Sequence, residues 1–218
     1  MFDDNTSESI HEFALHYDGQ QRASIRFAWN GKHAEEFHDE HQELRWSLAR
    51  LALAEPDSVP LVLLRDLLLE DSAWSHKAWC APHHFAGLLS ILLHRGGREY
   101  LFDFAAAMNA TFDTFGAAHE VVISAEEAHD LLLGAEAYLR VETDPRRRTE
   151  LESAQELFRK LIDGNAAEGW VQIPPGTPVR NVRVVASAPR SGQAGGPAKD
   201  ALRSLSNRLK RLFLRQVR

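Results

Sequence analysis

The segment from Trp74 to Phe115 constrains the fold of this chain more than any other. It contains two of the five tryptophans, the only cysteine and the densest run of large aliphatic and aromatic side chains. Side chains of this size stabilise a protein in water when most of their apolar area is buried against other segments. We therefore expect this segment to form the centre of a hydrophobic core, with the rest of the chain packed around it.

A chain of 218 residues is long enough for one domain and an appendage. Its longest apolar runs are interrupted by Arg65, Asp66 and His94, well short of the roughly 18 apolar residues that a membrane-spanning helix needs. The acidic, polar start lacks the basic and apolar pattern of a secretory signal, and a single cysteine excludes an internal disulfide. These features together favour a cytoplasmic protein.

Charge is divided unevenly along the chain. Residues 199–218 contain seven basic residues and one acidic residue, a net charge of +6. Residues 1–198 contain 18 basic and 30 acidic residues, a net charge of −12. This asymmetry indicates a basic tail that binds something anionic, and it makes nucleic-acid binding by the acidic body unfavourable.

Apolar residues recur at spacings of three and four in several segments between about residue 34 and residue 165, which is typical of amphipathic helices. Pro56, Pro82 and the Gly96-Gly97 pair are expected to separate these helices. Ser124-Ala-Glu-Glu127 is a capping box, and Asp144-Pro145 is a typical helix start. The expected helices span residues 34–55, 60–71, 83–94, 98–115, 124–139 and 145–162, and the segment 74–81 either prolongs the second helix or forms a separate turn. The sequence therefore predicts a mainly α, multi-helix domain.

Two stretches with alternating apolar residues predict minor antiparallel β-hairpins, one over residues 13–29 and one over residues 170–186. Residues 1–12 show no apolar periodicity and are expected to be loose. Residues 187–198 have the composition of a flexible linker. The expected organisation is an acidic, mostly helical domain over residues 1–186, this linker, and a basic amphipathic helix over residues 199–218.

The tail is the candidate partner-binding site. Its leucines recur at spacings of three, four and three, so a helix here has one narrow leucine seam and one cationic face. The residues expected to contact a partner are Leu202, Leu205, Leu209, Leu212, Phe213, Arg208, Lys210, Arg211 and Arg215. Because a leucine seam suits an apolar groove, docking on the chain's own body or on a protein partner is favoured over an anionic membrane surface, and nucleic acid comes last.

Cys80, followed by His83 and His84, suggests a second kind of site. A thiolate beside an imidazole can act as a nucleophile. A lone cysteine next to a tryptophan is more often a small buried hydrophobe, and catalytic partners are usually distant in sequence. The alternative hypothesis of a Cys/His or metal-dependent enzyme places its site within residues 76–119, with His119 or Asp113 as further members.

Carboxylate and imidazole groups share a helix face in Glu35-x-x-His38 and Glu126-x-x-His129, as they do in di-metal helical bundles. In a chain with 18 glutamates and 11 histidines, such pairs are expected to arise by chance. Solvated charged faces explain them more simply, and the chain contains no nucleotide-binding loop, nucleophile elbow or zinc motif. We therefore predict no catalytic residue, metal or cofactor.

The charge division and the lack of catalytic motifs favour an intracellular protein-interaction module, such as an adaptor or a partner-neutralising protein. In this interpretation the acidic helical body binds a protein partner, possibly basic, and the tail supplies a second contact. The alternatives are the enzyme described above and a peripheral membrane-surface protein attached through residues 199–218. No feature of the sequence indicates a particular small-molecule substrate.

Overall fold

The computed structural model describes residues 4–163, with side chains from residue 8 onwards. Within this range the chain is mainly helical, which confirms the predicted fold class, and its only β pairing is an isolated antiparallel bridge between Trp29 and Asp39. No helix in the described part is long and apolar enough to cross a membrane. The predicted hairpin at 170–186, the linker at 187–198 and the helix at 199–218 lie outside the described residues.

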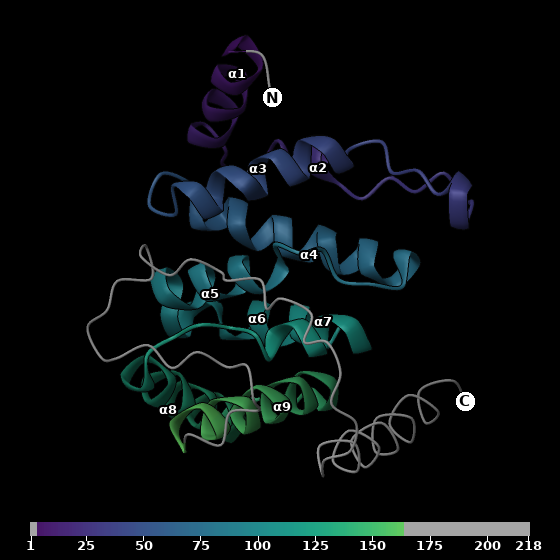
Figure 1. Ribbon diagram of the computed structural model, residues 1–218. Helices are drawn as coiled ribbons and strands as arrows, with labels where there is room; N and C mark the ends of the chain where they lie inside the picture. Colours follow the sequence, from purple (N-terminus) through teal and green to yellow (C-terminus); the bar gives the residue numbers. More distant parts are fainter. Residues whose placement is uncertain (1–3, 164–218) are drawn as a thin grey trace, which may run out of the picture. The chain divides into compact units, whose positions relative to one another are not determined.

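The helices pack in successive layers (Figure 1). Helix α1 packs against α3 at one end, α8 packs against α9 at the other, and α4 to α7 lie between them. The α-helices are α1 (Asp4–Leu15), α2 (Arg22–Ile25), α3 (Gln42–Ala54), α4 (Leu61–Ala78), α5 (Phe85–Gly96), α6 (Leu101–Met108), α7 (Phe112–Ala118), α8 (Ala125–Val141) and α9 (Pro145–Ile162). Two 3-10 helices span Ala34–Glu36 and Gly97–Tyr100.

One hydrophobic core runs through all these layers, and the Trp74–Phe115 segment supplies its centre, as expected. Helices α5 and α6 contribute Phe85, Leu88 and Phe104, each fully buried. Each side chain of this size stabilises the folded state by about 1.5–3 kcal/mol relative to an exposed position. The core therefore depends on α4, α5 and α6, and the outer helices cover it.

Several predicted helix boundaries are confirmed. Ser124 Oγ accepts a hydrogen bond from the Glu127 amide at 3.1 Å, and the Ser124 amide donates to Glu127 Oε2 at 2.7 Å. Asp144 accepts hydrogen bonds from the first amides of α9, with Pro145 at the first helical position. Gly97 ends α5 with a positive φ of 52°, a conformation that favours glycine. These signals are local, which is why the sequence predicts them.

The predicted N-terminal hairpin over residues 13–29 is wrong, as is the predicted loose N-terminus from Asp4 onwards. Helix α1 extends through Leu15, and α2 occupies Arg22–Ile25. The residues of α1 and the turn after it that face the core are Ile10, Phe13, Ala14 and Tyr17. Their spacing is helical, whereas Leu15, which produced the apparent alternation, is 61% exposed.

Side chains of α4 hold this N-terminal segment in place. The Tyr17 hydroxyl donates to Asp66 Oδ2 at 2.8 Å, and Arg22 pairs with Glu70 at 2.7 Å. Burial and the hydrogen bond to Asp66 raise the pKa of Tyr17. The segment thus folds through contacts with residues almost fifty positions away, which local alternation does not reveal.

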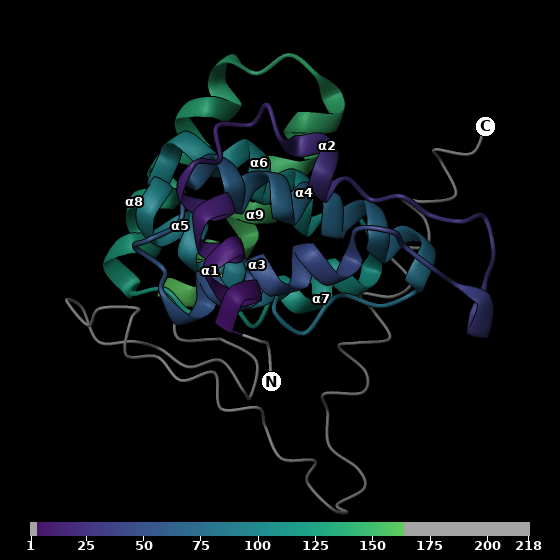
Figure 2. The same cartoon turned by 90° about the horizontal axis from the view of Figure 1, so that it is seen from above.

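The helix predicted over residues 34–55 begins later than expected, at Gln42. Residues 26–41 instead form an arm that extends away from the helices in two views (Figures 1 and 2). Asp39 ends the arm, because its Oδ1 accepts hydrogen bonds from the amides of Ala28 at 3.0 Å and His41 at 3.3 Å. An aspartate that bonds neighbouring amides in this way competes with helix formation.

The helix predicted over residues 98–115 is divided. Helix α6 ends at Met108 and α7 begins at Phe112. Thr111 caps α7 through a reciprocal pair of hydrogen bonds with Thr114, at 3.0 and 2.8 Å. Asn109 stabilises the break by donating to backbone carbonyls of Ala105 and Glu150. The division places Phe112 at the first position of a new helix.

We predict that Ser124→Ala lowers the free energy of unfolding by about 0.5–2 kcal/mol, because the Glu127 amide at the start of α8 loses its hydrogen-bond acceptor. Urea denaturation followed by circular dichroism measures this change. Ser153→Ala is the matched control, since the Ser153 hydroxyl only donates to the Thr149 carbonyl of its own helix. Equal effects of the two substitutions would contradict the role assigned to the capping box.

Candidate functional site

The nine predicted partner-binding residues of the tail lie outside the described residues. Within the described part, the most unusual surface lies where α4 ends and α7 begins. Trp79 follows the last residue of α4 and is 82% exposed. Phe112 begins α7 and is 56% exposed.

Trp79 adopts the left-handed conformation, with a φ of 59° and a ψ of 30°. Its amide donates to the Ser75 carbonyl at 3.2 Å and so closes the last turn of α4. Glycine or asparagine usually occupies such a helix end, because other side chains cost about 1–2 kcal/mol in this conformation. A large apolar side chain is therefore displayed to solvent from a strained backbone position, which points to a role outside folding.

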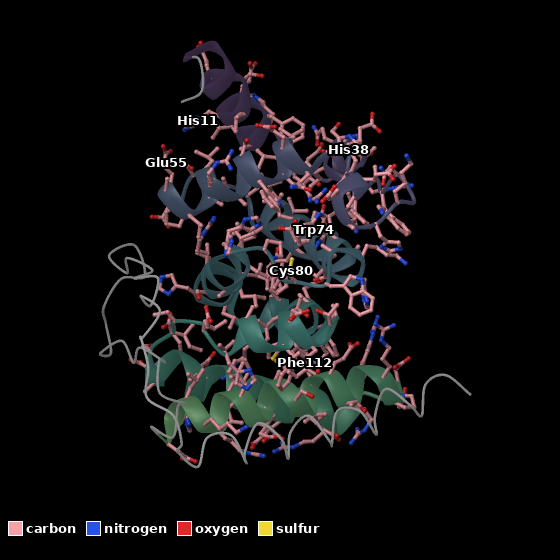
Figure 3. The ribbon with its side chains drawn as sticks, turned by 45° about the vertical axis from the view of Figure 1, so that its right-hand side comes forward. His11, His38, Glu55, Trp74, Cys80 and Phe112 are labelled. Carbon is pink, nitrogen blue, oxygen red and sulfur yellow. The ribbon has the colours of Figure 1, made fainter. Side chains whose placement is uncertain are left out.

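Cys80 follows Trp79 in the chain, between α4 and α5. Helix α7 packs against α4, and the Asp113 carboxylate lies close enough to Cys80 to influence its thiol. Trp74, Cys80 and Phe112 are labelled in the middle layers of the helical stack (Figure 3). The effect of Asp113 on Cys80 is the link between these two segments, and we call the four residues Trp79, Cys80, Phe112 and Asp113 the aromatic surface.

Both signs of charge occur near these residues: Lys77 is exposed two residues before Trp79, and carboxylates lie on and next to α7. Asp113 and Glu120 are both exposed, at the beginning and just past the end of α7. Neither forms an ion pair with any residue in the described range. Gly116, one turn after Phe112, has no atom within 4 Å of the position that a β-carbon would take. The region therefore combines exposed apolar rings, open space at Gly116 and carboxylates that form no ion pair within residues 4–163.

A buried network of charged side chains joins the segments next to this surface. Arg45 is fully buried and donates from Nη2 to Asp39 Oδ2 at 2.6 Å and from Nε to Asp71 Oδ1 at 3.0 Å. Its Nη1 also donates to the Ile25 carbonyl at 3.3 Å. One guanidinium therefore joins α2, the arm, α3 and α4.

His84 extends the network to α5. Its Nε2 lies 2.6 Å from Asp71 Oδ2, and a carboxylate in this position accepts the ring N–H. Asp71 lies on α4 about two turns before its end and His84 directly precedes α5, so this contact joins the two helices that flank Trp79 and Cys80. The contact thereby holds together the two helices that flank the exposed loop.

Aromatic rings pack beside the network. The ring of Trp46 meets those of Trp74 and His84 edge-on, with centroid distances of 5.7 and 5.8 Å. Phe37 from the arm packs edge-on against Trp74 at 6.0 Å. Trp46 Nε1 is the only buried side-chain nitrogen or oxygen without a hydrogen-bond partner among the described residues. Ring packing thus attaches the arm to α4, and the pair of Asp39 with Arg45 attaches it to α3.

Cys80 is exposed, so the expectation that it is a small buried hydrophobe is wrong. Partial burial of the thiol raises its pKa, and the nearby Asp113 charge raises it further. Both effects disfavour the thiolate, whereas a nucleophilic cysteine needs a cationic neighbour that favours it.

The histidines predicted around Cys80 are not assembled into a catalytic pair. Cys80 forms no hydrogen bond with a histidine in the described part of the chain. His84 is directed to Asp71, and His119 Nδ1 lies 2.8 Å from the Phe115 carbonyl. Burial lowers the pKa of His119 and of His76. The geometry therefore supplies no base for the nucleophile hypothesis.

Metal ligands do not converge within residues 4–163, where no group of three or more histidine, cysteine or acidic side chains is placed to hold an ion. Glu35, His38, Glu126 and His129 are all exposed. Their helical spacing therefore describes solvated surfaces in this structure.

Comparison with known proteins adds no family to this geometry. A scan of protein-family models, a search of curated proteins and a search of solved structures each found no match to the chain.

Sequence reasoning singled out Cys80 but overlooked Trp79 and Phe112. A signal for Phe112 was present, since Thr111-Phe-Asp-Thr114 places two hydroxyl residues at capping-box spacing. A signal for Trp79 was weaker, because the sequence left open where the second helix ended. Exposure of a tryptophan depends on the packing of other segments and has no local sequence pattern.

We predict that Arg45→Met lowers the free energy of unfolding by about 3–5 kcal/mol, because it leaves the buried Asp39 and Asp71 carboxylates without their cation. Urea denaturation measures the loss. Arg98→Met is the matched control, since Arg98 pairs with Asp130 at the surface and should change stability far less. A similar small effect of both substitutions would show that the network does not support the fold.

We predict that alkylation of Cys80 rises with pH around a midpoint above about 8.5, the ordinary thiol pKa, because burial and Asp113 both favour the protonated thiol. Iodoacetamide labelling between pH 7 and pH 10 measures the midpoint. Asp113→Asn should move the midpoint toward lower pH, since it removes the negative charge. A wild-type midpoint below 8 would restore the nucleophile hypothesis.

Proposed function

We propose that this chain is a protein-interaction module, an adaptor or a partner-neutralising protein, whose acidic helical body binds a basic protein partner at the aromatic surface. The observation that carries this proposal is the 82% exposure of Trp79 in a left-handed backbone conformation. Tryptophan is among the residues that contribute most to protein interfaces, because its large ring loses much water contact on binding. Phe112 supplies a second apolar anchor from a different helix.

Charge supports a basic partner. Residues 4–163 contain 15 basic and 28 acidic residues, a net charge of −13. Such a field accelerates encounter with a cationic protein and repels nucleic acid. The carboxylates of Asp113 and Glu120, unpaired within the described residues, provide local partners for lysine or arginine at the rim of the interface.

The contact between Asp71 and His84 supports the proposal as well. Trp79 and Cys80 lie between α4 and α5, which the Asp71–His84 contact joins directly. A binding residue on a fixed support loses less conformational entropy on association than one on a flexible loop. The surface is therefore organised before a partner arrives.

The basic segment 199–218 is the second contact of the proposed module. Its leucine seam and cationic face suit an apolar groove with acidic edges. A single free cysteine and the absence of an internal disulfide agree with a reducing compartment, so we place this activity in the cytoplasm.

We predict that Trp79→Gly weakens partner binding by at least about tenfold, the loss expected for an interface tryptophan. The same substitution should leave the free energy of unfolding unchanged or raise it by up to about 1 kcal/mol, because glycine tolerates the left-handed conformation. Tagged full-length protein is used to capture partners from nuclease-treated source lysate, and the retained proteins are identified and their affinities measured.

Leu15→Ala is the matched control for this experiment. Leu15 is 61% exposed on α1, so the substitution removes a comparable exposed apolar side chain from a different part of the body. A basic protein held equally by wild type and Leu15→Ala, and lost with Trp79→Gly, is the expected result. Capture of the same partner by Trp79→Gly at wild-type affinity would remove Trp79 from the interface and with it the main support for the proposal.

A further inference from the structure

The outer face of α8 has the features of a surface that binds a second copy of the same chain. Helix α8 packs against α9 in the last layer of the stack (Figure 1). Its buried residues are Ala128, Leu131, Gly134 and Ala135. We propose that the opposite face of α8 pairs antiparallel with the same face of a second copy and forms a weak, symmetric homodimer. This contact shares no residue with the aromatic surface and goes beyond the proposed partner binding.

An apolar stripe runs along the outer face of α8. Leu133 is 44% exposed, Val141 is 74% exposed, and Ala137 between them is also exposed. Residues four apart on a helix lie on the same face. Leu133 is two residues from the buried Leu131 and two from the buried Ala135, so it projects from the opposite side of the helix. The solvent side of α8 is therefore centred on a leucine.

Two charged side chains on this face are free to pair with another molecule. Glu126 and Arg140 are exposed, and neither forms an ion pair within residues 4–163. Each of the other acidic side chains of α8 is paired inside the chain: Glu127 with His94, Asp130 with Arg98, and Glu136 with Arg159. The face therefore offers one unpaired charge of each sign.

These two charges are placed symmetrically about Leu133. Glu126 is seven residues before it and Arg140 is seven residues after it. Seven residues fall about 20° short of two full turns, so both charges lie near the line of Leu133, each about 10 Å from it along the helix. If two α8 helices lie antiparallel with Leu133 on a twofold axis, Glu126 of each copy comes level with Arg140 of the other. The face is thus self-complementary, as a twofold interface requires.

The order of the charges favours a second copy over other occupants. A uniformly basic surface would place a like charge against Arg140, and a uniformly acidic surface would do the same to Glu126. A surface with the two charges in reverse order and at the same separation satisfies both. An antiparallel α8 is such a surface. Ion pairs at the contact also offset the repulsion between two bodies that each carry a net charge of −13 over residues 4–163.

The size of the contact predicts a weak dimer. Helix α8 has 17 residues and is therefore about 25 Å long. One face of such a helix buries less surface than the roughly 1,200–2,000 Å² of a typical stable interface. We expect a dissociation constant on the order of 100 μM, so the dimer forms where the protein is concentrated.

Sedimentation equilibrium of the full-length chain tests the proposal, with a reducing agent present so that Cys80 forms no disulfide. Between about 10 and about 1,000 μM, the weight-average mass should rise from that of a monomer toward that of a dimer. Leu133→Asp should weaken association at least about tenfold, because it places two carboxylates at the twofold axis. Leu15→Asp is the matched control, since Leu15 is 61% exposed on α1, and it should change association much less.

Charge reversal tests the antiparallel register. Glu126→Arg alone and Arg140→Glu alone should each weaken self-association about tenfold, because like charges then meet at both ends of the contact. An equimolar mixture of these two variants should associate as tightly as the wild type, since each end again joins opposite charges. Each substitution opposes the helix dipole, so circular dichroism is used to compare helix content. Recovery in the mixture would also exclude misfolding as the cause of the loss.

Three outcomes would overturn the proposal. The first is a monomer at every concentration. The second is self-association that Leu133→Asp leaves intact, which would place the contact elsewhere in the chain, and at the aromatic surface if Trp79→Gly abolishes it. The third is a mixture of folded Glu126→Arg and Arg140→Glu that associates no better than either variant alone, which would show that these side chains do not meet across the interface.

Discussion

The pairing of Arg45 with Asp39 and Asp71 is the interaction on which most of the described structure depends. It is completely buried, and it joins the end of the arm, α3 and α4 around one guanidinium. Removing a charged group from water is costly unless its partners are well placed, so this site tolerates few alternative arrangements. Because Asp71 also contacts His84, the position of α5 follows from the same pairing. The hydrophobic core provides most of the stabilising free energy, and the ionic network determines how its helices are aligned.

The aromatic surface is a consequence of that alignment. The chain must pass from α4 to α5 across a short connection between two helices that the Asp71–His84 contact joins, and Trp79 absorbs the change of direction in a left-handed conformation. The break between α6 and α7 places Phe112 at the exposed start of α7. Neither ring contributes much to the core. Exposing these rings lowers the stability of the folded protein. Such a loss is most readily retained where binding requires the exposed rings.

Features that depend on interactions between residues close in sequence were predicted, and features that depend on distant residues were missed. Ser124 and Asp144 bond to amides within three residues, so the beginnings of α8 and α9 were predictable from local sequence. Asn109 stops α6 partly through the Glu150 carbonyl, and Tyr17 is fixed by Asp66. These partners are distant in sequence, which explains why the division of the 98–115 helix was missed and a hairpin was predicted near the N-terminus. The candidate surface was missed for the same reason, since the exposure of a side chain depends on whether segments distant in sequence pack against it.

The exposed thiol of Cys80 has a practical consequence for any preparation of this protein. Two copies meeting through their Cys80 side chains under oxidising conditions can become joined by a disulfide. Such a covalent dimer would have Trp79 at its junction and would withhold the surface from other molecules. Loss of binding during storage, reversed by a reducing agent, would then reflect chemistry at one sulfur atom while the fold remained intact.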